Sequence, residues 1–143
     1  MSSNQFSTFY VENRLFGINV KLVQEITKAM PITPVPLAPN YIHGLINLRG
    51  QIATAISIRE LFQMSPASID HSKINVVCKS DGLLLSLVVD EVGDVLELED
   101  NLFESTPETV SENVKQFMSG IYKLPNNLLS VLDIQKLIDF LNQ

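Results

Sequence analysis

The sequence has few of the residues from which metal centres and disulfide frameworks are built. It contains one cysteine, Cys78, two histidines, His43 and His71, and no tryptophan. A single cysteine excludes an intramolecular disulfide and a CxxC pair, so we interpret Cys78 as a small buried side chain on a strand. No HxxxH pair or histidine–cysteine cluster supplies the three or four ligands of a zinc site, and we expect no metal.

Sequence motifs for enzyme chemistry and for phosphate binding are missing as well. The chain has no GxSxG motif, no GxGxxG and no GxxxxGK[ST] loop. These motifs place a nucleophile on a tight turn or wrap backbone N–H groups around a phosphate. We therefore expect a protein with no catalytic residues and no bound cofactor.

Positive charge is scarce and spread thinly. Ten lysine and arginine residues stand against 16 acidic ones, the net charge is −6 at pH 7, and no two basic residues are adjacent. A protein that binds the phosphate backbone needs a basic stripe, so we expect no nucleic-acid partner.

Long apolar runs are also missing. The longest, residues 83–92, is interrupted by Ser86, Asp90 and Glu91, and it is far shorter than the ~20 residues that cross a bilayer. The first residues have neither the basic nor the apolar region of a signal peptide. We expect a cytoplasmic protein that does not insert into a membrane and is a monomer when isolated.

What the sequence does have is β-forming apolar sequence, with 45% hydrophobic residues. We predict strands over residues 6–11, 15–20, 44–50, 51–57, 73–79, 83–89, 93–98, 120–124 and 128–132. Short helices are predicted over residues 21–26, 58–62, 111–118 and 134–141. Four prolines within residues 30–39 predict an extended segment that cannot be a central strand.

An internal repeat is visible in this pattern. Residues 44–61 match residues 120–137, 76 positions later, at one glycine, at three aliphatic residues and at nearly every apolar position. A weaker similarity joins residues 16–20 to residues 85–89. We infer two similar β units that each close with a short helix. Because each unit is small for an independent core, we expect the two to share an apolar interface.

Two charges lie in unusually apolar surroundings. Arg49 follows Leu48 next to a turn glycine, and Glu25 is flanked by Val23 and Ile26. Three interpretations stay open: both are exposed turn charges, they pair with each other, or Arg49 faces a protein partner. An acidic run from Asp90 to Asp100 is either a solvated strand face or the site of a small-ligand sensor or enzyme.

A chain of motifs resembles a known family. The sequence VQEI at residues 23–26 is followed by ITPVPLAPNYIHGLINLRG at residues 32–50, with LVVDEV at 87–92 and LDI at 132–134. This combination resembles CheW, the chemotaxis coupling protein, and the regulatory domain of the CheA kinase. The resemblance implies one mostly β domain over residues 6–141, made of two SH3-like five-stranded β-barrels with a few short helices. We place the subdomains at 14–72 and 73–141, and strand 6–11 is a candidate for exchange into the second.

The resemblance also implies a function. CheW-like proteins are non-catalytic adaptors that couple the cytoplasmic tips of methyl-accepting chemoreceptors to the regulatory domain of a CheA-type histidine kinase, in membrane-associated arrays. It assigns an ion pair to Glu25 and Arg49 and coupling positions to Val20, Val23 and Gly44. The sequence departs from the family at Thr54, Ser57 and Ser86, where proline, aspartate and glycine are common. An alternative is therefore a scaffold of a secondary, pilus-type or other non-flagellar pathway.

Overall fold

The computed structural model describes residues 2–65 and 74–142. Ten strands dominate it, joined by short helical segments. The strands are β1 (Ser3–Val11), β2 (Arg14–Asn19), β3 (Val23–Lys28), β4 (Ile42–Leu48), β5 (Gln51–Ser57), β6 (Ile74–Ser80), β7 (Leu83–Val89), β8 (Glu91–Glu99), β9 (Met118–Lys123) and β10 (Leu128–Leu132). The helical segments are η1 (Val20–Leu22), α1 (Ile58–Leu61), η2 (Asp100–Leu102), α2 (Glu112–Lys115) and α3 (Ile134–Leu141).

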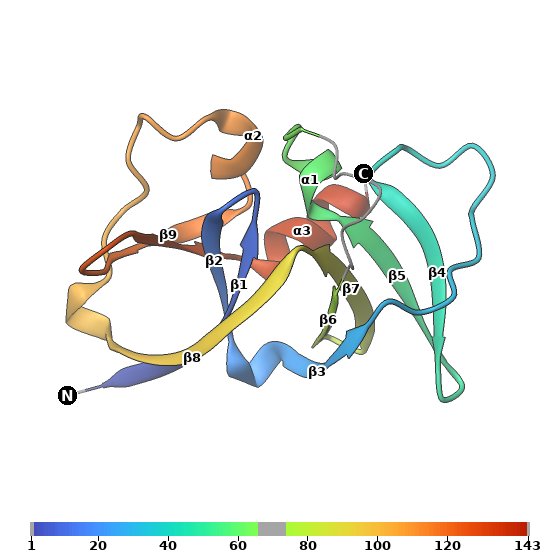
Figure 1. Cartoon of the computed structure of the whole chain (residues 1–143), viewed down its shortest axis with the longest axis horizontal. Helices are drawn as coiled ribbons and strands as arrows, with labels where there is room; N and C mark the ends of the chain where they lie inside the picture. The colour runs from blue at the N-terminus through green and yellow to red at the C-terminus, as the bar shows by residue number, and fades with distance from the viewer. Residues whose placement is uncertain (1, 66–73, 143) are drawn as a thin grey trace.

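The strands form two five-stranded sheets that lie side by side (Figure 1). One sheet has the order β8-β1-β2-β10-β9 and uses strands from both ends of the chain, so we call it the terminal unit. The other has the order β3-β6-β7-β5-β4 and uses the middle of the chain, so we call it the central unit. The expected mostly β fold with two five-stranded SH3-like units is confirmed.

The two sheets are equivalent strand for strand. In each, one pair of central neighbours is parallel, β2 with β10 and β7 with β5, and the remaining pairs are antiparallel. Gly17 lies opposite Val131, and Ser86 lies opposite Ala55. Gly17 and Ser86 are therefore equivalent, 69 residues apart, and Ala55 and Val131 are equivalent, 76 residues apart. Both offsets are those of the repeats seen in the sequence.

The expected division of the chain at residues 72 and 73 is wrong for the sheets. That boundary lies outside the described residues, but β5 before it and β7 after it are parallel neighbours in one sheet. Strand β1 does join strands of the C-terminal half, and β2 joins them with it. The reason is that the two central strands of each sheet are parallel, and a tight turn cannot join parallel strands. Each sheet therefore combines hairpins from different parts of the chain, and β1 and β2 pair with strands near the C-terminus.

A single backbone bridge joins the ends of each sheet. The proline-rich segment after β3 crosses β4, where Thr33 and Leu45 exchange hydrogen bonds of 2.9 and 2.8 Å. The segment after β8 crosses β9 in the same way through Glu104 and Ile121, with two bonds of 2.9 Å. We call these crossing segments straps. Each strap continues from one edge strand and reaches the opposite edge strand, where it is held by an isolated bridge, so each unit is SH3-like but its sheet does not close into the expected barrel.

A glycine lies under each strap. A Cβ atom on Gly44 would collide with the Thr33 carbonyl group, and one on Gly120 would collide with the Glu104 carbonyl oxygen. Gly44 also has a φ of 147°, a conformation that other residues rarely adopt. The repeated glycine of the sequence is therefore explained by close backbone approach.

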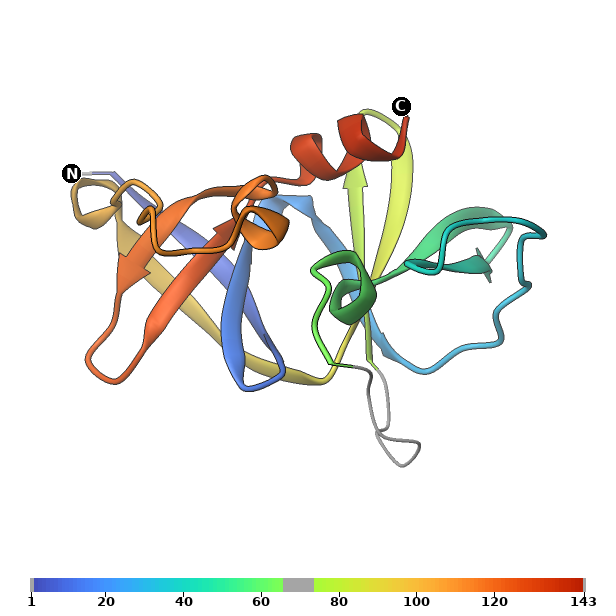
Figure 2. The same cartoon turned by 90° about the horizontal axis from the view of Figure 1, so that it is seen from above.

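Three apolar cores stabilise this arrangement. Each unit has a small core of its own, and a larger shared core lies between them, built from both sheets and from α1, α2 and α3. Figure 2 shows α1 (green) and α3 (red) at the junction of the units. Phe62, at the end of α1, lies 5.5 Å from the Phe16 ring of β2 and 5.7 Å from the Phe117 ring. The expected shared apolar interface is confirmed.

The helices differ from expectation at two places. Residues 21–26 form the short 3₁₀ turn η1 and then β3, because the β-branched residues of β3 pair with β6. The helix expected over 111–118 is limited to α2, because strand β9 begins at Met118. Helix α3 has the expected bounds, and the Asp133 side chain caps it by accepting from the N–H groups of Gln135 and Lys136.

Candidate functional site

Glu25 and Arg49 meet at the edge of the central unit. Arg49 donates Nη2 to Glu25 Oε1 at 2.5 Å and Nη1 to Oε2 at 3.3 Å, a two-point contact between guanidinium and carboxylate. The Arg49 side chain is 73% exposed and that of Glu25 is 23% exposed. These bonds and the Glu25 charge raise the pKa of Arg49. Of the three interpretations, the structure shows the pairing of Glu25 with Arg49. The arginine of this pair lies on an exposed turn.

The Arg49 side chain is positioned by a two-residue hairpin turn between β4 and β5. Leu48 pairs with Gln51, and the two residues between them have positive φ values, 50° at Arg49 and 89° at Gly50. This is the turn geometry that matches the twist of a hairpin. Asn47 supports it by accepting a 2.9 Å hydrogen bond from the Gly50 N–H. Each residue of the NLRG motif therefore has a local role.

Glu25 comes from β3, an edge strand with an irregularity beside it. Val23 lies opposite Cys78 and Glu25 lies opposite Val77, so Gln24 is an extra residue on this strand. Such a bulge redirects the side chains that follow it. Val20 and Val23 lie just before Glu25 and are half-buried.

Gly44 lies at the far end of β4 from Arg49, buried beneath the strap. Four of the five expected site residues are therefore on η1, β3 and the β4–β5 turn, and the fifth has a structural position.

A second ion pair was missed by the sequence reasoning. Arg59 of α1 donates to both carboxylate oxygens of Asp90, Nε to Oδ1 at 3.0 Å and Nη2 to Oδ2 at 2.6 Å. Its Nη1 donates to the Ser65 carbonyl oxygen at 2.8 Å. The two side chains are only 13% and 14% exposed. The hydrogen bonds to Asp90 are the main reason why the pKa of Arg59 is raised.

This second pair links the two units. The backbone N–H of Glu12, in the β1–β2 turn of the terminal unit, donates to Asp90 Oδ2 at 2.8 Å. The Glu12 carboxylate lies 3.8 Å from Arg59 Nη1 and accepts a hydrogen bond from the Ser65 N–H. We call Glu12, Arg59 and Asp90 the latch. No local sequence pattern indicates the latch, because Asp90 lies in the acidic run and its burial depends on the junction of the two units.

The comparisons with known proteins agree with this architecture. The family model of the CheW-like domain matches residues 5–141. The chain belongs to the CheW-like family. It is 31% identical to chemotaxis protein CheW of Klebsiella aerogenes over 134 residues, which is 94% of this chain and 81% of that protein. It is also 31% identical to CheW of Bacillus subtilis over 132 residues, 92% of this chain and 84% of that protein.

The fold also matches a solved CheW structure. The crystal structure of the scaffolding protein TtCheW from Thermoanaerobacter tengcongensis superimposes with a TM-score of 0.84 at 26% identity. The match covers 92% of this chain and 90% of that one. The chain is therefore a CheW-like scaffold protein of chemotaxis signalling.

The departures from the CheW pattern are accommodated by the fold. Ser57 accepts a hydrogen bond from the Glu60 N–H and caps α1, a role that aspartate also performs. Ser86 is buried and donates to Asn75 Oδ1 at 2.9 Å. Thr54 lies half-buried on β5. None of the three lies in the Glu25–Arg49 pair.

The acidic run does not form a metal-binding cluster within residues 2–65 and 74–142. Asp90 belongs to the latch, Glu97 accepts from Ser3, and Asp100 accepts from Asn4. His43 is half-buried, with Nε2 3.3 Å from a Glu60 carboxylate oxygen, and His71 lies outside the described residues.

Cys78 is buried in the shared core of this CheW-like fold, and desolvation raises the pKa of its thiol to about 12. The expectation of a small core residue on a strand is confirmed.

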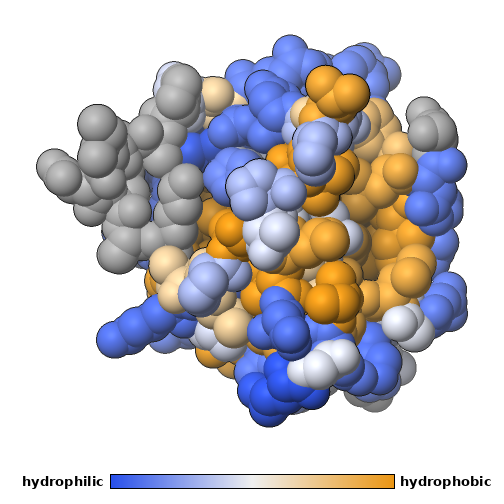
Figure 3. Space-filling model, turned by 90° about the vertical axis from the view of Figure 1, so that its right-hand side faces the viewer, coloured by the Kyte–Doolittle hydropathy of each residue, from blue (hydrophilic) through white to orange (hydrophobic). Residues whose placement is uncertain are grey.

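The outer end of the central unit is apolar. Figure 3 shows apolar side chains gathered across this side of the molecule. The exposed residues of the strap and of the β4–β5 hairpin belong to it, and we define the apolar end as Val35, Leu37, Leu45 and Ile52. Contiguous exposed apolar surface of this kind marks a protein-binding surface. No helix within the described ranges has the length and apolar character that a membrane span requires.

Proposed function

We propose that this protein is a non-catalytic adaptor that couples the cytoplasmic tip of a methyl-accepting chemoreceptor to the regulatory domain of a CheA-type histidine kinase. Family membership over residues 5–141 and the CheW-like fold support this role. The adaptor acts through interfaces alone, and binding to receptors recruits it to membrane-associated arrays.

The observation that carries the proposal is the exposed Glu25–Arg49 pair. Arg49 is held in a left-handed backbone conformation, which costs free energy in a non-glycine residue. Its side chain is 73% exposed, and exposed ion pairs contribute little to stability. Folding alone therefore does not account for the pair. A guanidinium group fixed by a carboxylate at an edge is instead suited to binding a protein partner, since arginine is common in binding hot spots.

We assign the receptor-facing surface to Glu25 and Arg49 together with Val20 and Val23. The two valines are half-buried beside the edge strand, so they offer apolar contact next to the charged pair. Gly44 contributes indirectly, because it allows the strap to close against β4. We assign the apolar end of the central unit to contact with the kinase domain.

Calorimetric titration tests this assignment. The protein is titrated with the regulatory domain of each CheA-type kinase of the same cell, and then the receptor tip fragment is added. We expect saturable 1:1 binding to one kinase domain. Arg49→Ala should leave kinase binding unchanged and weaken receptor binding by about tenfold, since a hot-spot arginine is lost.

Lys79→Ala is the matched control, because Lys79 is an exposed basic residue on β6 of the same sheet. It should bind both partners as the wild type does. Failure of every kinase domain to bind would overturn the coupling function. Binding to a kinase of a pilus-type system alone would instead support the alternative of a secondary pathway.

A further inference from the structure

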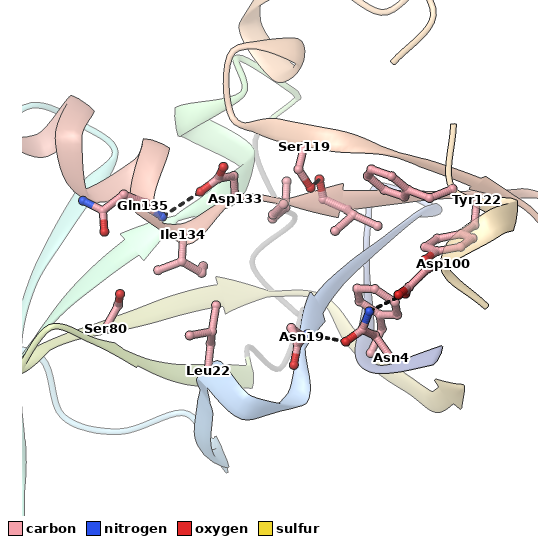
Figure 4. A pocket seen from close by; sticks show the side chains of 14 residues that line it. Asn4, Asn19, Leu22, Ser80, Asp100, Ser119, Tyr122, Asp133, Ile134 and Gln135 are labelled. Atoms are coloured by element: carbon pink, nitrogen blue, oxygen red, sulfur yellow. Dashed lines mark hydrogen bonds between the residues drawn. The ribbon is translucent and has the colours of Figure 1, made fainter. Parts of the chain in front are cut away.

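A cavity of about 380 Å³ lies at the junction of the two units. Its walls come from β1, η2, β9, β10 and the start of α3, with Leu22 and Ser80 contributed by the central side (Figure 4). Cavities of this volume are typical of ligand sites. Neither the Glu25–Arg49 pair nor the latch contributes a residue to it.

The polar lining of the cavity carries negative charge only. Asp100 and Asp133 both line it, and among the described residues no lysine, arginine or histidine does. Asp100 Oδ1 accepts from Asn4 Nδ2 at 2.6 Å. Asp133 Oδ1 accepts from the N–H groups of Gln135 and Lys136 at 2.9 and 3.2 Å. Within the described part of the chain, the second oxygen of each carboxylate accepts no hydrogen bond, so each can still accept one from a cation.

An aromatic cluster lines the cavity beside Asp100. The Tyr122 ring lies 5.5 Å from Phe6 and 5.2 Å from Phe103, measured between ring centroids. The pKa of the Tyr122 hydroxyl is raised, chiefly by burial and then by the Asp100 charge. Aromatic rings next to a carboxylate favour a planar organic cation, which stacks on a ring while it donates to the oxygens.

The repeat of the fold provides an internal precedent. Gln135, which lines the cavity, occupies the position of Arg59 in the other unit, 76 residues earlier. The β6–β7 turn beside the cavity is likewise equivalent to the β1–β2 turn beside Arg59, and both turns have two residues with positive φ. At the Arg59 position the cleft is filled by a guanidinium group bound to Asp90 and to the Ser65 carbonyl oxygen.

The cavity lies at the equivalent junction with glutamine in place of the arginine, and its two carboxylates, Asp100 and Asp133, belong to this unit alone and are not the counterparts of Asp90. Gln135 is shorter than arginine, and its Nε2 donates to Asp139 at 2.9 Å, along α3. We propose that this cavity binds the guanidinium group of an arginine side chain supplied by a partner protein. A peptide-borne side chain is favoured over free arginine, because the carboxylate of the free amino acid would be brought near Asp100 and Asp133.

The test uses the whole protein and ¹⁵N-resolved NMR titration with N-acetyl-arginine amide as the probe. The neutral isostere N-acetyl-citrulline amide and free arginine are titrated in parallel. We expect saturable shifts centred on Ser80, Ser119 and Gln135 with the arginine amide, weaker binding of free arginine, and no saturable shift with citrulline.

Substitutions then locate the binding. Asp100→Asn and Asp133→Asn should each weaken the arginine amide by about tenfold, because a charge-assisted hydrogen bond becomes a neutral one. Asparagine keeps the helix cap and the acceptor for Asn4, so the fold should persist. Asp94→Asn removes the same charge from an exposed position on β8 and should have no effect.

Gln135→Arg supplies the missing guanidinium from within the chain and should abolish probe binding, while the rest of the NMR spectrum is retained. The proposal is overturned if citrulline and arginine shift the same amides equally. It is also overturned if Asp94→Asn weakens binding as much as Asp100→Asn does, since the effect would then be one of net charge. None of these measurements needs a receptor or a kinase, so their outcome is independent of the proposed coupling function.

Discussion

The two units have the same strand order but use it differently. The small core of the terminal unit contains Leu129 and Val131, whereas the equivalent positions of the central unit are Ala53 and Ala55. At these two positions the central unit therefore has the smaller side chains, and it also carries the apolar end and the Glu25–Arg49 pair. Two units with the same strand order can therefore differ in use. One has larger core side chains, and the other carries exposed apolar and charged side chains that suit partner binding.

The turns of the two units show the same difference. The β4–β5 turn holds Arg49 at a φ of 50°, and the equivalent turn of the terminal unit has Pro125 at that position. Proline fixes φ near −65°, so the terminal unit cannot form the same turn. The charged pair is consequently a property of one unit rather than of the fold.

The largest effect is expected from breaking the strap of the central unit. Gly44→Ala should lower the free energy of unfolding by about 3 kcal/mol, because the added Cβ meets the Thr33 carbonyl group at an unfavourable φ. Chemical denaturation measures this loss. Gly50→Ala is the matched control: its φ is also positive, but nothing lies within 4 Å of the added Cβ. Equal losses at the two glycines would show that strap crowding is unimportant.

A smaller loss of stability is expected when Arg59 of the latch is replaced by the residue found at the equivalent position beside the cavity. Arg59→Gln places at the latch the residue found at the equivalent position 135 and leaves Asp90 without its guanidinium. We expect the free energy of unfolding to fall by about 2 kcal/mol. Arg49→Gln, the same change in the exposed pair, should leave the unfolding midpoint unchanged. If both variants unfold at the wild-type midpoint, the latch does not hold the units together.

The apolar end provides a comparison at the surface. Ile52 and Leu128 are equivalent residues that follow the two hairpin turns, and both are exposed. Ile52→Asp should weaken binding of the kinase regulatory domain by about tenfold, because it puts a charge into an apolar contact. Leu128→Asp should not. Calorimetry measures the affinity of each variant for the kinase regulatory domain. An equal loss of affinity in both variants would mean that the kinase does not distinguish the units.

The smallest effect concerns the shared core. The Cys78 thiol is buried and its pKa is about 12, so it stays protonated at pH 8 to 10. Native protein should therefore not react with Ellman's reagent in this range, whereas unfolded protein reacts fully. A native reaction rate that rises with pH as it does for a free thiol would show that the core opens at this strand.

Local features of the fold were predictable from the sequence because they depend on neighbouring residues. Hairpins, the bounds of α3 and the equivalence of residues 44–61 and 120–137 all follow from periodicity and turn residues. The division into units was not predictable in this way, because it depends on parallel pairing between β2 and β10, more than a hundred residues apart. Sequence order alone assigns β2 to the wrong unit.

The candidate site was predictable only in part, for a related reason. Glu25 and Arg49 drew attention because apolar residues surround them in the sequence. Arg59 and Asp90 did not, because Asp90 lies in an acidic run that is typical of a solvated strand. Their burial arises from the junction of two units, which no local pattern reveals. The cavity also lies between the two units, so no local pattern in the sequence indicates it.

The most direct test of the central claim is kinase activity in an assembly reconstituted from receptor, kinase and this protein, with Arg49→Glu, Glu25→Arg and the double variant. Each single charge reversal should abolish activation while the protein remains folded. The double variant should restore part of the activity, because the pair forms again with its charges exchanged. Full activation by the Arg49→Glu variant would contradict the account, since the exposed pair would then have no part in coupling.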